Sequence, residues 1–239
     1  MAFLMKYDIV PRYLSGPSKR RPTAPMQPCR FIVAHDTGNP GSTAAGNVAY
    51  YQNTRNAQEA SAHIFVDDKQ ILECIPFLTA RPEKAWHVRY NVPGDNQRYG
   101  VDANDAAGGI ELCHGGSIDI KQAYSRYVWL IAFACYTYNL NPSVDIAGHF
   151  ELDPARRTDP KGALQLLGKT FRDFIEDVTA EYAACIRSDN PPDVIAPEDA
   201  NKIIRFLSAG YMATEVAEAR TEFNRLANEL RRRSGQPLQ

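Results

Sequence analysis

Short β-prone runs alternate with longer helical patterns along most of the chain, and this alternation constrains the fold more than any other feature. Apolar runs at 31–34, 61–67 and 109–113 each give way to polar or turn residues, as buried strands do. Residues 71–75 return directly after Asp67-Asp68-Lys69-Gln70, which is typical of a hairpin turn and an antiparallel strand pair. Helices between strands favour a sheet covered on its faces. The sequence therefore predicts an α/β fold with a mixed central β-sheet flanked by helices.

The stretches between these runs differ in character. Apolar residues favour helices over 43–53, 120–140 and 162–186. Residues 89–108 are rich in polar residues and include a Pro-Gly pair, so we expect a long surface loop there. Residues 1–28, rich in Pro, Arg and Ser, are expected to form an extended lead-in.

A Pro-Pro pair near residue 191 predicts a division of the chain. We expect a catalytic domain over 1–188, a linker over 189–195 and a small helical unit over 196–239, in keeping with a length of 239 residues. Amphipathic patterns at 197–209 and 214–233 predict a helical hairpin for targeting or assembly. A unit of that size has too little core to stand alone, so its apolar faces should pack on the large domain, a second copy or a cell wall.

Composition excludes several classes of protein. With 27 basic and 28 acidic residues the net charge is −1, which argues against binding nucleic acid by bulk charge. No run of 18 apolar residues exists, so we expect no membrane span. Lys6 interrupts the N-terminal apolar stretch too early for a signal peptide, and we expect synthesis in the cytoplasm. Most of the five widely spaced cysteines, which include no CxxC, are expected in the core.

Two histidines stand where apolar runs meet polar loops. These are His35 and His149, and Asp159 follows the second by ten residues. Two imidazoles and one carboxylate suit zinc, and a catalytic zinc takes three protein ligands and leaves one position for water. The spacing is equally compatible with loop histidines in ordinary polar contacts.

Two charged residues accompany this set. Glu111 falls in a run expected to be buried on at least one face, where a carboxylate is costly unless it is paired or faces a wet cleft. It is either a general acid–base or the partner of an arginine. Arg157 lies two residues before Asp159, so on an extended segment it projects to the same side. It either stabilises an oxyanion or is simply solvated.

Other chemistry is less well supported. The adjacent Cys113 and His114 would face opposite ways on a strand, which disfavours a cysteine hydrolase. Trp86, Tyr90 and Tyr99 lie in and around the 89–108 stretch, where they either stack on sugar rings or pack in the core.

Taken together, these residues resemble the zinc-dependent N-acetylmuramoyl-L-alanine amidases of the amidase-2 family. That family includes phage lysins, bacterial autolysins and the peptidoglycan-recognition proteins. The resemblance covers roughly residues 27–180 and is carried, in the family's order, by Phe31–Thr37, Ser61–Asp67, Ala85–His87, Gly109–Leu112 and Gly148–Pro160.

The resemblance implies one zinc in a surface groove, with His35, His149 and Asp159 as ligands. Glu111 matches the catalytic glutamate of the bacterial and phage branch, and Arg157 stands where many members have lysine. His63 and His87 also match family positions near the groove, but the resemblance does not make them ligands.

The resemblance also implies a function. The protein would be a peptidoglycan hydrolase that cleaves the amide between N-acetylmuramic acid and L-alanine, with peptidoglycan or muropeptides as its partner. A phage or prophage endolysin, made in the cytoplasm and acting on the wall after release, is the leading interpretation. The alternatives are a cytoplasmic amidase that recycles muropeptides and a non-catalytic peptidoglycan-binding protein. Self-association through the C-terminal helices is a further expectation.

Overall fold

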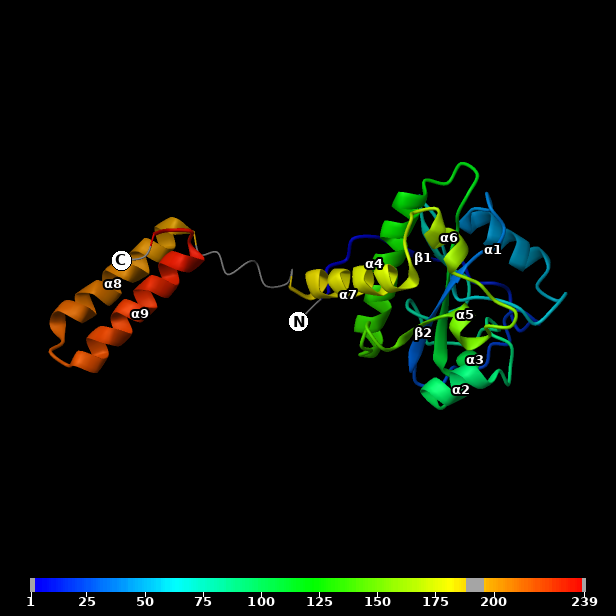
Figure 1. Ribbon diagram of the computed structural model, residues 1–239, viewed down its shortest axis with the longest axis horizontal. Helices are drawn as coiled ribbons and strands as arrows, with labels where there is room; N and C mark the ends of the chain where they lie inside the picture. Colours follow the sequence, from blue (N-terminus) through cyan, green and yellow to red (C-terminus); the bar gives the residue numbers. More distant parts are fainter. Residues whose placement is uncertain (1–2, 188–195, 238–239) are drawn as a thin grey trace. The chain divides into compact units, whose positions relative to one another are not determined.

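The computed structural model describes residues 3–187 and 196–237. Contacts within the chain divide it into two compact units, residues 1–186 and residues 187–239 (Figure 1). We describe each unit by itself. The linker expected at 189–195 lies outside the described residues.

The first unit is built on a six-stranded sheet with the order β1-β4-β3-β5-β2-β6. β3 and β4 pair antiparallel, as the hairpin turn predicts, while every other neighbouring pair is parallel. The prediction of an α/β fold with a mixed sheet is therefore confirmed. The strands are β1 (Ile9–Pro11), β2 (Phe31–Asp36), β3 (Ile64–Val66), β4 (Ile71–Glu73), β5 (Ala107–Leu112) and β6 (Ile146–Gly148).

The β3–β4 turn is held by one carboxylate. Asp67 Oδ1 accepts hydrogen bonds from the backbone N–H groups of Lys69 and Gln70, at 2.8 and 2.9 Å, which is an Asx-type turn. Its Oδ2 accepts from the N–H of Ala44 at 2.9 Å, where α1 (Ala44–Asn53) begins. A single residue thus fixes both the hairpin and the start of the neighbouring helix.

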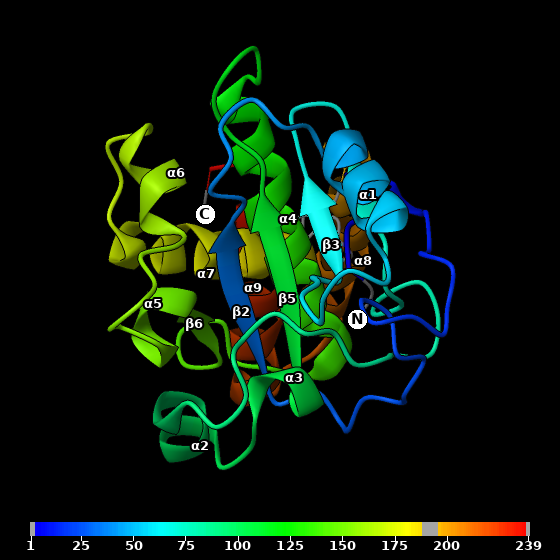
Figure 2. The ribbon, with the colours of Figure 1, turned by 90° about the vertical axis from the view of Figure 1, so that its right-hand side faces the viewer.

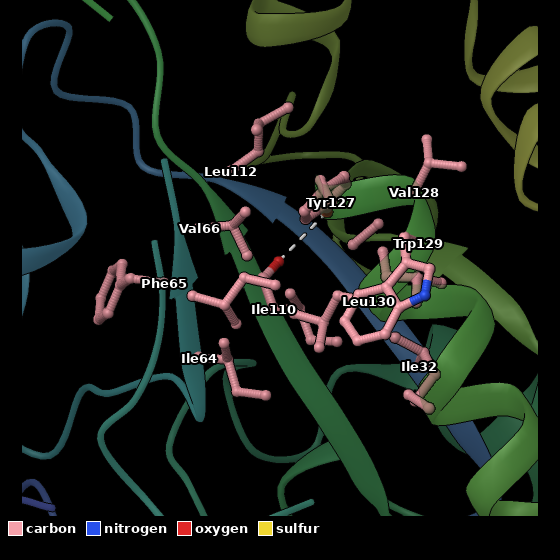
Figure 3. Close-up of a cluster of buried hydrophobic side chains, with 14 of the residues drawn as sticks. Ile32, Ile64, Phe65, Val66, Ile110, Leu112, Tyr127, Val128, Trp129 and Leu130 are labelled. Atoms are coloured by element: carbon pink, nitrogen blue, oxygen red, sulfur yellow. Dashed lines mark hydrogen bonds between the residues drawn. The ribbon is translucent and has the colours of Figure 1, made fainter. Parts of the chain in front are cut away.

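One face of the sheet packs against α4 (Ile120–Tyr138), and Figure 2 shows β2, β5 and β3 side by side with this helix behind them. Successive strand side chains point to opposite faces, and Figure 3 shows Ile64 and Val66 directed toward Trp129 while Phe65 points away. All five cysteines are free and buried, which confirms their expected place in the core. α7 (Phe171–Arg187) completes this layer; the ring of Phe174 lies 5.5 Å from that of Tyr127.

The opposite face carries a smaller apolar core and the polar residues singled out above. Phe31, Val33 and His35 share this face on β2, and the register places His35 opposite Glu111 of β5. Because β2, β5 and β6 run parallel, their carboxyl ends meet at one edge. The short helices near this face and edge are α2 (Pro93–Tyr99), α3 (Ala103–Ala106), α5 (His149–Leu152) and α6 (Lys161–Gln165).

The expectation of a long loop at 89–108 is wrong. The segment forms α2 and α3 and then enters β5. Its polar side chains serve the backbone: Asp102 accepts from the N–H of Asn104 as the N-cap of α3, and the buried Asp95 accepts from the N–H of Ala103 at 2.9 Å. The segment does lie at the surface, since Arg89, Asn96 and Gln97 are exposed, but its buried polar residues bind backbone and two short helices form.

One other expectation needs correction. The single helix expected over 162–186 is divided into α6 and α7, and Gly168, with φ +65°, supplies the left-handed residue between them. The N-terminal lead-in contains an extended segment, as expected, and this segment, β1, pairs with β4 at the edge of the sheet. A three-residue strand is too short to show an apolar alternation.

The second unit is a hairpin of α8 (Pro197–Ala213) and α9 (Ala217–Arg233), close to the two helices expected there. Ala200, Ile204 and Ala227 are buried within it. Phe206 and Met212 remain 78% and 80% exposed. No helix in the described part of the chain is long and apolar enough to cross a membrane.

Candidate active site

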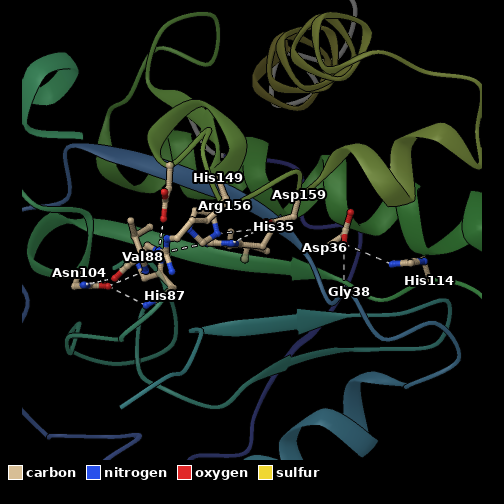
Figure 4. Close-up of polar contacts among 12 residues, drawn as sticks. His35, Asp36, Gly38, His87, Val88, Asn104, His114, His149, Arg156 and Asp159 are labelled. Atoms are coloured by element: carbon tan, nitrogen blue, oxygen red, sulfur yellow. Dashed lines mark hydrogen bonds and ion pairs between the residues drawn. The ribbon is translucent and has the colours of Figure 1, made fainter. Parts of the chain in front are cut away.

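Three potential metal ligands meet at the edge where β2 and β6 end (Figure 4). The register pairs Ala34 with Gly148, so the residues that follow them, His35 on β2 and His149 at the start of α5, emerge at the same place. Asp159 reaches them from the loop before α6. Among the described residues this is the only group of three His, Cys, Asp or Glu side chains whose ligand atoms lie within 4.8 Å of one another.

The geometry of this cluster suits a small cation. Asp159 Oδ2 lies 2.9 Å from His35 Nδ1 and 3.1 Å from His149 Nδ1, and the two imidazole planes cross at 80°. Tetrahedral zinc with bonds of about 2.0–2.1 Å separates its ligand atoms by about 3.3 Å. The donor types and the two separations at Asp159 Oδ2 therefore fit a zinc ion.

Backbone hydrogen bonds hold the loop of Asp159 in place. The N–H of Phe150, directly after His149, donates to the carbonyl of Asp159 at 3.1 Å. Asp36, directly after His35, accepts from the N–H groups of Gly38 and Ala163, at 3.1 and 3.0 Å. The residues that follow His35 and His149 thus bind the segment that carries Asp159 and begins α6.

Burial and mutual contact shift the pKa values of the cluster. Burial opposes ionisation of Asp159, but hydrogen bonds with His149 and His35 hold its pKa well below the usual range. Burial lowers the pKa of His149 to about 4, in spite of Asp159. Burial also opposes charge on His35, yet the carboxylates of Asp159 and Glu111 raise its pKa. The pocket thus favours a positive charge beside Asp159, which a metal cation would also supply.

Glu111 faces the same groove from β5. Its Oε2 is buried and has no hydrogen-bond partner, and no ion pair to Glu111 is found in the part of the chain that the structure describes. Burial raises the pKa of its carboxyl group to about 8. An unpaired carboxylate in a groove has the properties of a proton carrier, whereas the alternative of a salt bridge to arginine is not realised.

Arg157 lies on the exposed loop that forms one wall of this groove. Its N–H donates to the carbonyl of Asp153 at 3.0 Å, which closes the turn before Asp159. The neighbouring Arg156 pairs with the carboxylate of Asp153, so it is engaged elsewhere. The guanidinium of Arg157 makes no ion pair among the described residues and is free to meet a ligand.

The groove has a volume of about 330 Å³, and four polar side-chain atoms in its lining residues are buried without a partner. Buried polar groups are normally satisfied, so such a concentration marks a place where a polar ligand completes the hydrogen bonds. These atoms are Thr37 Oγ1, Trp86 Nε1, Glu111 Oε2 and His149 Nε2.

The aromatic residues in and around the 89–108 segment have two different roles. Trp86 lines the groove. Tyr99 stacks on Phe31 with ring centroids 3.8 Å apart, so it belongs to the core. His87, which sequence spacing does not connect with any other histidine, lies 3.2 Å from His35 and was not identified as a functional residue by sequence reasoning.

Comparisons with known proteins agree with this architecture. A family profile described as N-acetylmuramoyl-L-alanine amidase, Amidase_2, matches residues 25–162. Two amidases of Bacillus subtilis strain 168 are similar in sequence: CwlA is 34% identical over 110 residues, and BlyA is 30% identical over 142 residues. These matches cover 45% and 55% of this chain but only 35% and 37% of CwlA and BlyA. The chain thus spans about a third of the length of these relatives.

Solved structures share the fold of the first unit. The catalytic domain of XlyA is 24% identical, with a TM-score of 0.57, over 72% of this chain and 99% of that one. A mutant endolysin from Bacillus subtilis is 25% identical with the same TM-score and the same coverage. The hydrolase AmiA of Staphylococcus aureus, solved with its ligand, is 22% identical with a TM-score of 0.57, over 75% of this chain and 85% of that one.

Proposed function

This chain belongs to the amidase-2 family, and from that membership and the geometry of the groove we propose that it is a peptidoglycan hydrolase. The bond cleaved is the amide between N-acetylmuramic acid and the L-alanine of the stem peptide. The observation that carries the proposal is the meeting of His35, His149, Asp159 and Glu111 at one edge of the sheet.

We assign His35, His149 and Asp159 as the ligands of one zinc ion. Two neutral imidazoles and one carboxylate form the N/O donor set of a catalytic zinc site, and the separations at Asp159 Oδ2 fit it. When bound, zinc supplies a Lewis acid that polarises an amide carbonyl and lowers the pKa of a coordinated water to about 7.

Glu111 is the general base and then the general acid. With Oε2 free, it takes a proton from the attacking water and passes it to the leaving nitrogen of the amide. A cation held by the neighbouring cluster favours the ionised carboxylate and so lowers its pKa from about 8.

Arg157 and two further residues of the groove bind the substrate. The free guanidinium of Arg157 stabilises the oxyanion that develops on the carbonyl oxygen. In the same groove, the indole N–H of Trp86 and the hydroxyl of Thr37 lack partners and bind polar groups of the sugar or peptide. Several free donors in one groove suit a polar substrate that extends beyond the scissile bond.

At the biological level, we propose that the protein is a phage or prophage endolysin that acts on the bacterial cell wall. The similarity to a solved endolysin and to the XlyA catalytic domain supports this assignment. A muropeptide-recycling amidase would act on soluble fragments but not on intact walls.

For the second unit we propose a role in wall recognition, with self-association as the alternative. Its hairpin leaves Phe206 and Met212 exposed to solvent, and none of the proposed catalytic residues belongs to it. Such large exposed apolar side chains favour a binding surface.

The test is to incubate the purified, zinc-loaded chain with bacterial cell walls and identify the new ends. Free L-alanine amino termini without new reducing sugars are expected. New reducing ends would show a glycosidase and overturn the proposal. Metal analysis should find about one zinc per chain, lost in His35→Ala and His149→Ala variants whose fold is confirmed by circular dichroism.

A further inference from the structure

A second histidine, His87, lies directly against His35. The Nε2 atom of His35 is 3.2 Å from Nδ1 of His87, and the two rings are nearly perpendicular, at 89°. His87 is buried, with 7% of its surface exposed. His35 thus meets Asp159 through one ring nitrogen and His87 through the other.

The tautomer of His87 follows from its other contact. Its Nε2 lies 3.1 Å from the carbonyl oxygen of Ala107, and a carbonyl can only accept. Nε2 therefore carries the hydrogen, and in the neutral ring Nδ1 holds a lone pair. No carboxylate contacts His87 among the described residues, so nothing there holds it as a cation.

His35 is constrained in turn. To meet the lone pair on His87 Nδ1, its Nε2 must donate a hydrogen, whether the ring of His35 is neutral or protonated. Only Nδ1 of His35 then remains as a metal ligand, and this atom is the one 2.9 Å from Asp159 Oδ2. His149 has no such support, because its Nε2 is buried without a partner.

The surrounding structure holds His87 firmly. Asn104 Oδ1 accepts from the backbone N–H groups of His87 and Val88, at 2.8 and 3.0 Å (Figure 4). On the sheet side, Gly109 makes room for the ring, since a Cβ there would lie 2.5 Å from Cγ of His87. His87 is therefore held by Asn104 of α3 at its backbone, while Gly109 of β5 leaves room for its ring.

We propose that His87 is a positioning residue for the metal site, which holds His35 in the tautomer and orientation that present Nδ1 to the metal. The inference rests on the proposed zinc site. Outer partners of ligating histidines are usually carboxylates, backbone carbonyls or water. Here a neutral imidazole, itself anchored to the carbonyl of Ala107, takes that place.

The first test measures zinc affinity of the full chain by competition with a chelating dye. His87→Phe removes the acceptor and should weaken zinc binding roughly 10–100-fold. His87→Gln keeps both an acceptor and a donor and should recover most of that loss. Tyr124→Phe, which removes only a hydrogen bond from α4 to Asp177 of α7, is the control and should bind zinc like the wild type.

The second test needs no variant. Multiple-bond ¹H–¹⁵N correlations of the wild-type imidazoles should show the hydrogen of His87 on Nε2, a bare Nδ1, and a hydrogen on Nε2 of His35. This readout decides the matter even where His87→Phe fails to fold.

Several results would overturn the inference. One is a hydrogen on Nδ1 of His87; another is a folded His87→Phe variant whose zinc affinity lies within twofold of the wild type. A His87→Gln variant as weak as His87→Phe would show that ring shape matters and not the acceptor. If the wild-type chain binds no zinc at all, the proposed function itself is wrong.

Discussion

At the scale of single residues, the most distinctive property of the groove is that its lining residues hold four buried polar atoms without hydrogen-bond partners. Each such atom costs about 1–3 kcal/mol while it stays unpaired. Elsewhere in the described chain, buried carboxylates such as Glu73 and Asp95 are fully engaged with backbone N–H groups. The difference indicates that Glu111 and its neighbours are arranged for a ligand and not for stability.

Glu111→Gln tests the base directly. The substitution keeps the size of the side chain but removes its ability to take a proton, so hydrolysis of cell walls should fall at least about 10²-fold. Zinc content and the circular dichroism spectrum should stay close to those of the wild type. Turnover near the wild-type rate would show that Glu111 has only a structural role.

The buried imidazole of His63 should make the folded protein less stable in mild acid. Burial lowers its pKa to about 4, although the hydrogen bond from Nε2 to the carbonyl of Glu83 acts in the opposite direction. Its Nδ1 accepts from the N–H of Gly109 at 3.0 Å. The unfolded chain binds this proton near pH 6.5, so the contribution is present above pH 6.5 and is lost as the pH falls toward 4. Between pH 7.5 and pH 5 it amounts to about 2 kcal/mol.

Denaturant unfolding at those two pH values measures the effect. The drop in unfolding free energy should be smaller in His63→Gln than in the wild type by about that amount. Identical drops in both proteins would mean that His63 is not the group responsible.

At the scale of elements, β5 owes its place to two adjacent glycines. A Cβ on Gly108 would lie 2.2 Å from the ring of Phe77, and one on Gly109 would lie 2.5 Å from His87. Two rings on opposite faces can thus approach the strand at successive residues. The same strand then presents Glu111 next to His35, so close packing and the reactive group share one element.

The end of β4 makes a second prediction at this scale. Glu73 is fully buried and accepts from the backbone N–H groups of Phe77, Leu78 and Thr79, at 2.8 to 3.3 Å. Glu73→Ala would leave these donors unpaired and should lower the unfolding free energy by about 2–3 kcal/mol.

Chemical denaturation at neutral pH provides the measurement. As the control, Glu176→Ala breaks only an exposed i,i+4 pair with Arg172 and should change stability little. If both variants are equally stable, the carboxylate of Glu73 does not organise the loop that follows β4.

At the scale of the whole molecule, the site and the exposed hairpin belong to different units. The first unit holds every proposed catalytic residue together with its own core. A chain that ends after residue 187 should therefore bind zinc and cleave small soluble muropeptides, but lose activity on intact walls.

Comparing the two chains on both substrates separates the possible roles. Equal activity on intact walls would rule out targeting. Loss of activity on soluble muropeptides would make the second unit part of the catalytic fold. If the full chain sediments as a dimer and the truncated chain as a monomer, the hairpin serves assembly.

The sequence by itself determined the features that depend on neighbouring residues. The strand patterns, the hairpin at Asp67, the long helix α4 and the place of the cysteines follow from short-range periodicity, turn chemistry and composition. The motifs also identified the family, because each is a short local stretch. At 89–108 local reasoning failed, since a buried polar side chain that binds backbone, such as Asp95, resembles a surface one. At 162–186 it missed the break at Gly168, whose φ of +65° separates α6 from α7.

Only the tertiary structure decided how the groove is assembled. His35 and Asp159 are 124 residues apart, and they meet because β2 lies between β5 and β6 in a definite register. Strand order and register depend on the packing of the whole sheet, so no local pattern contains them. The contact of His87 with His35 is of the same kind, because it requires a residue without a side chain at Gly109 on a different strand.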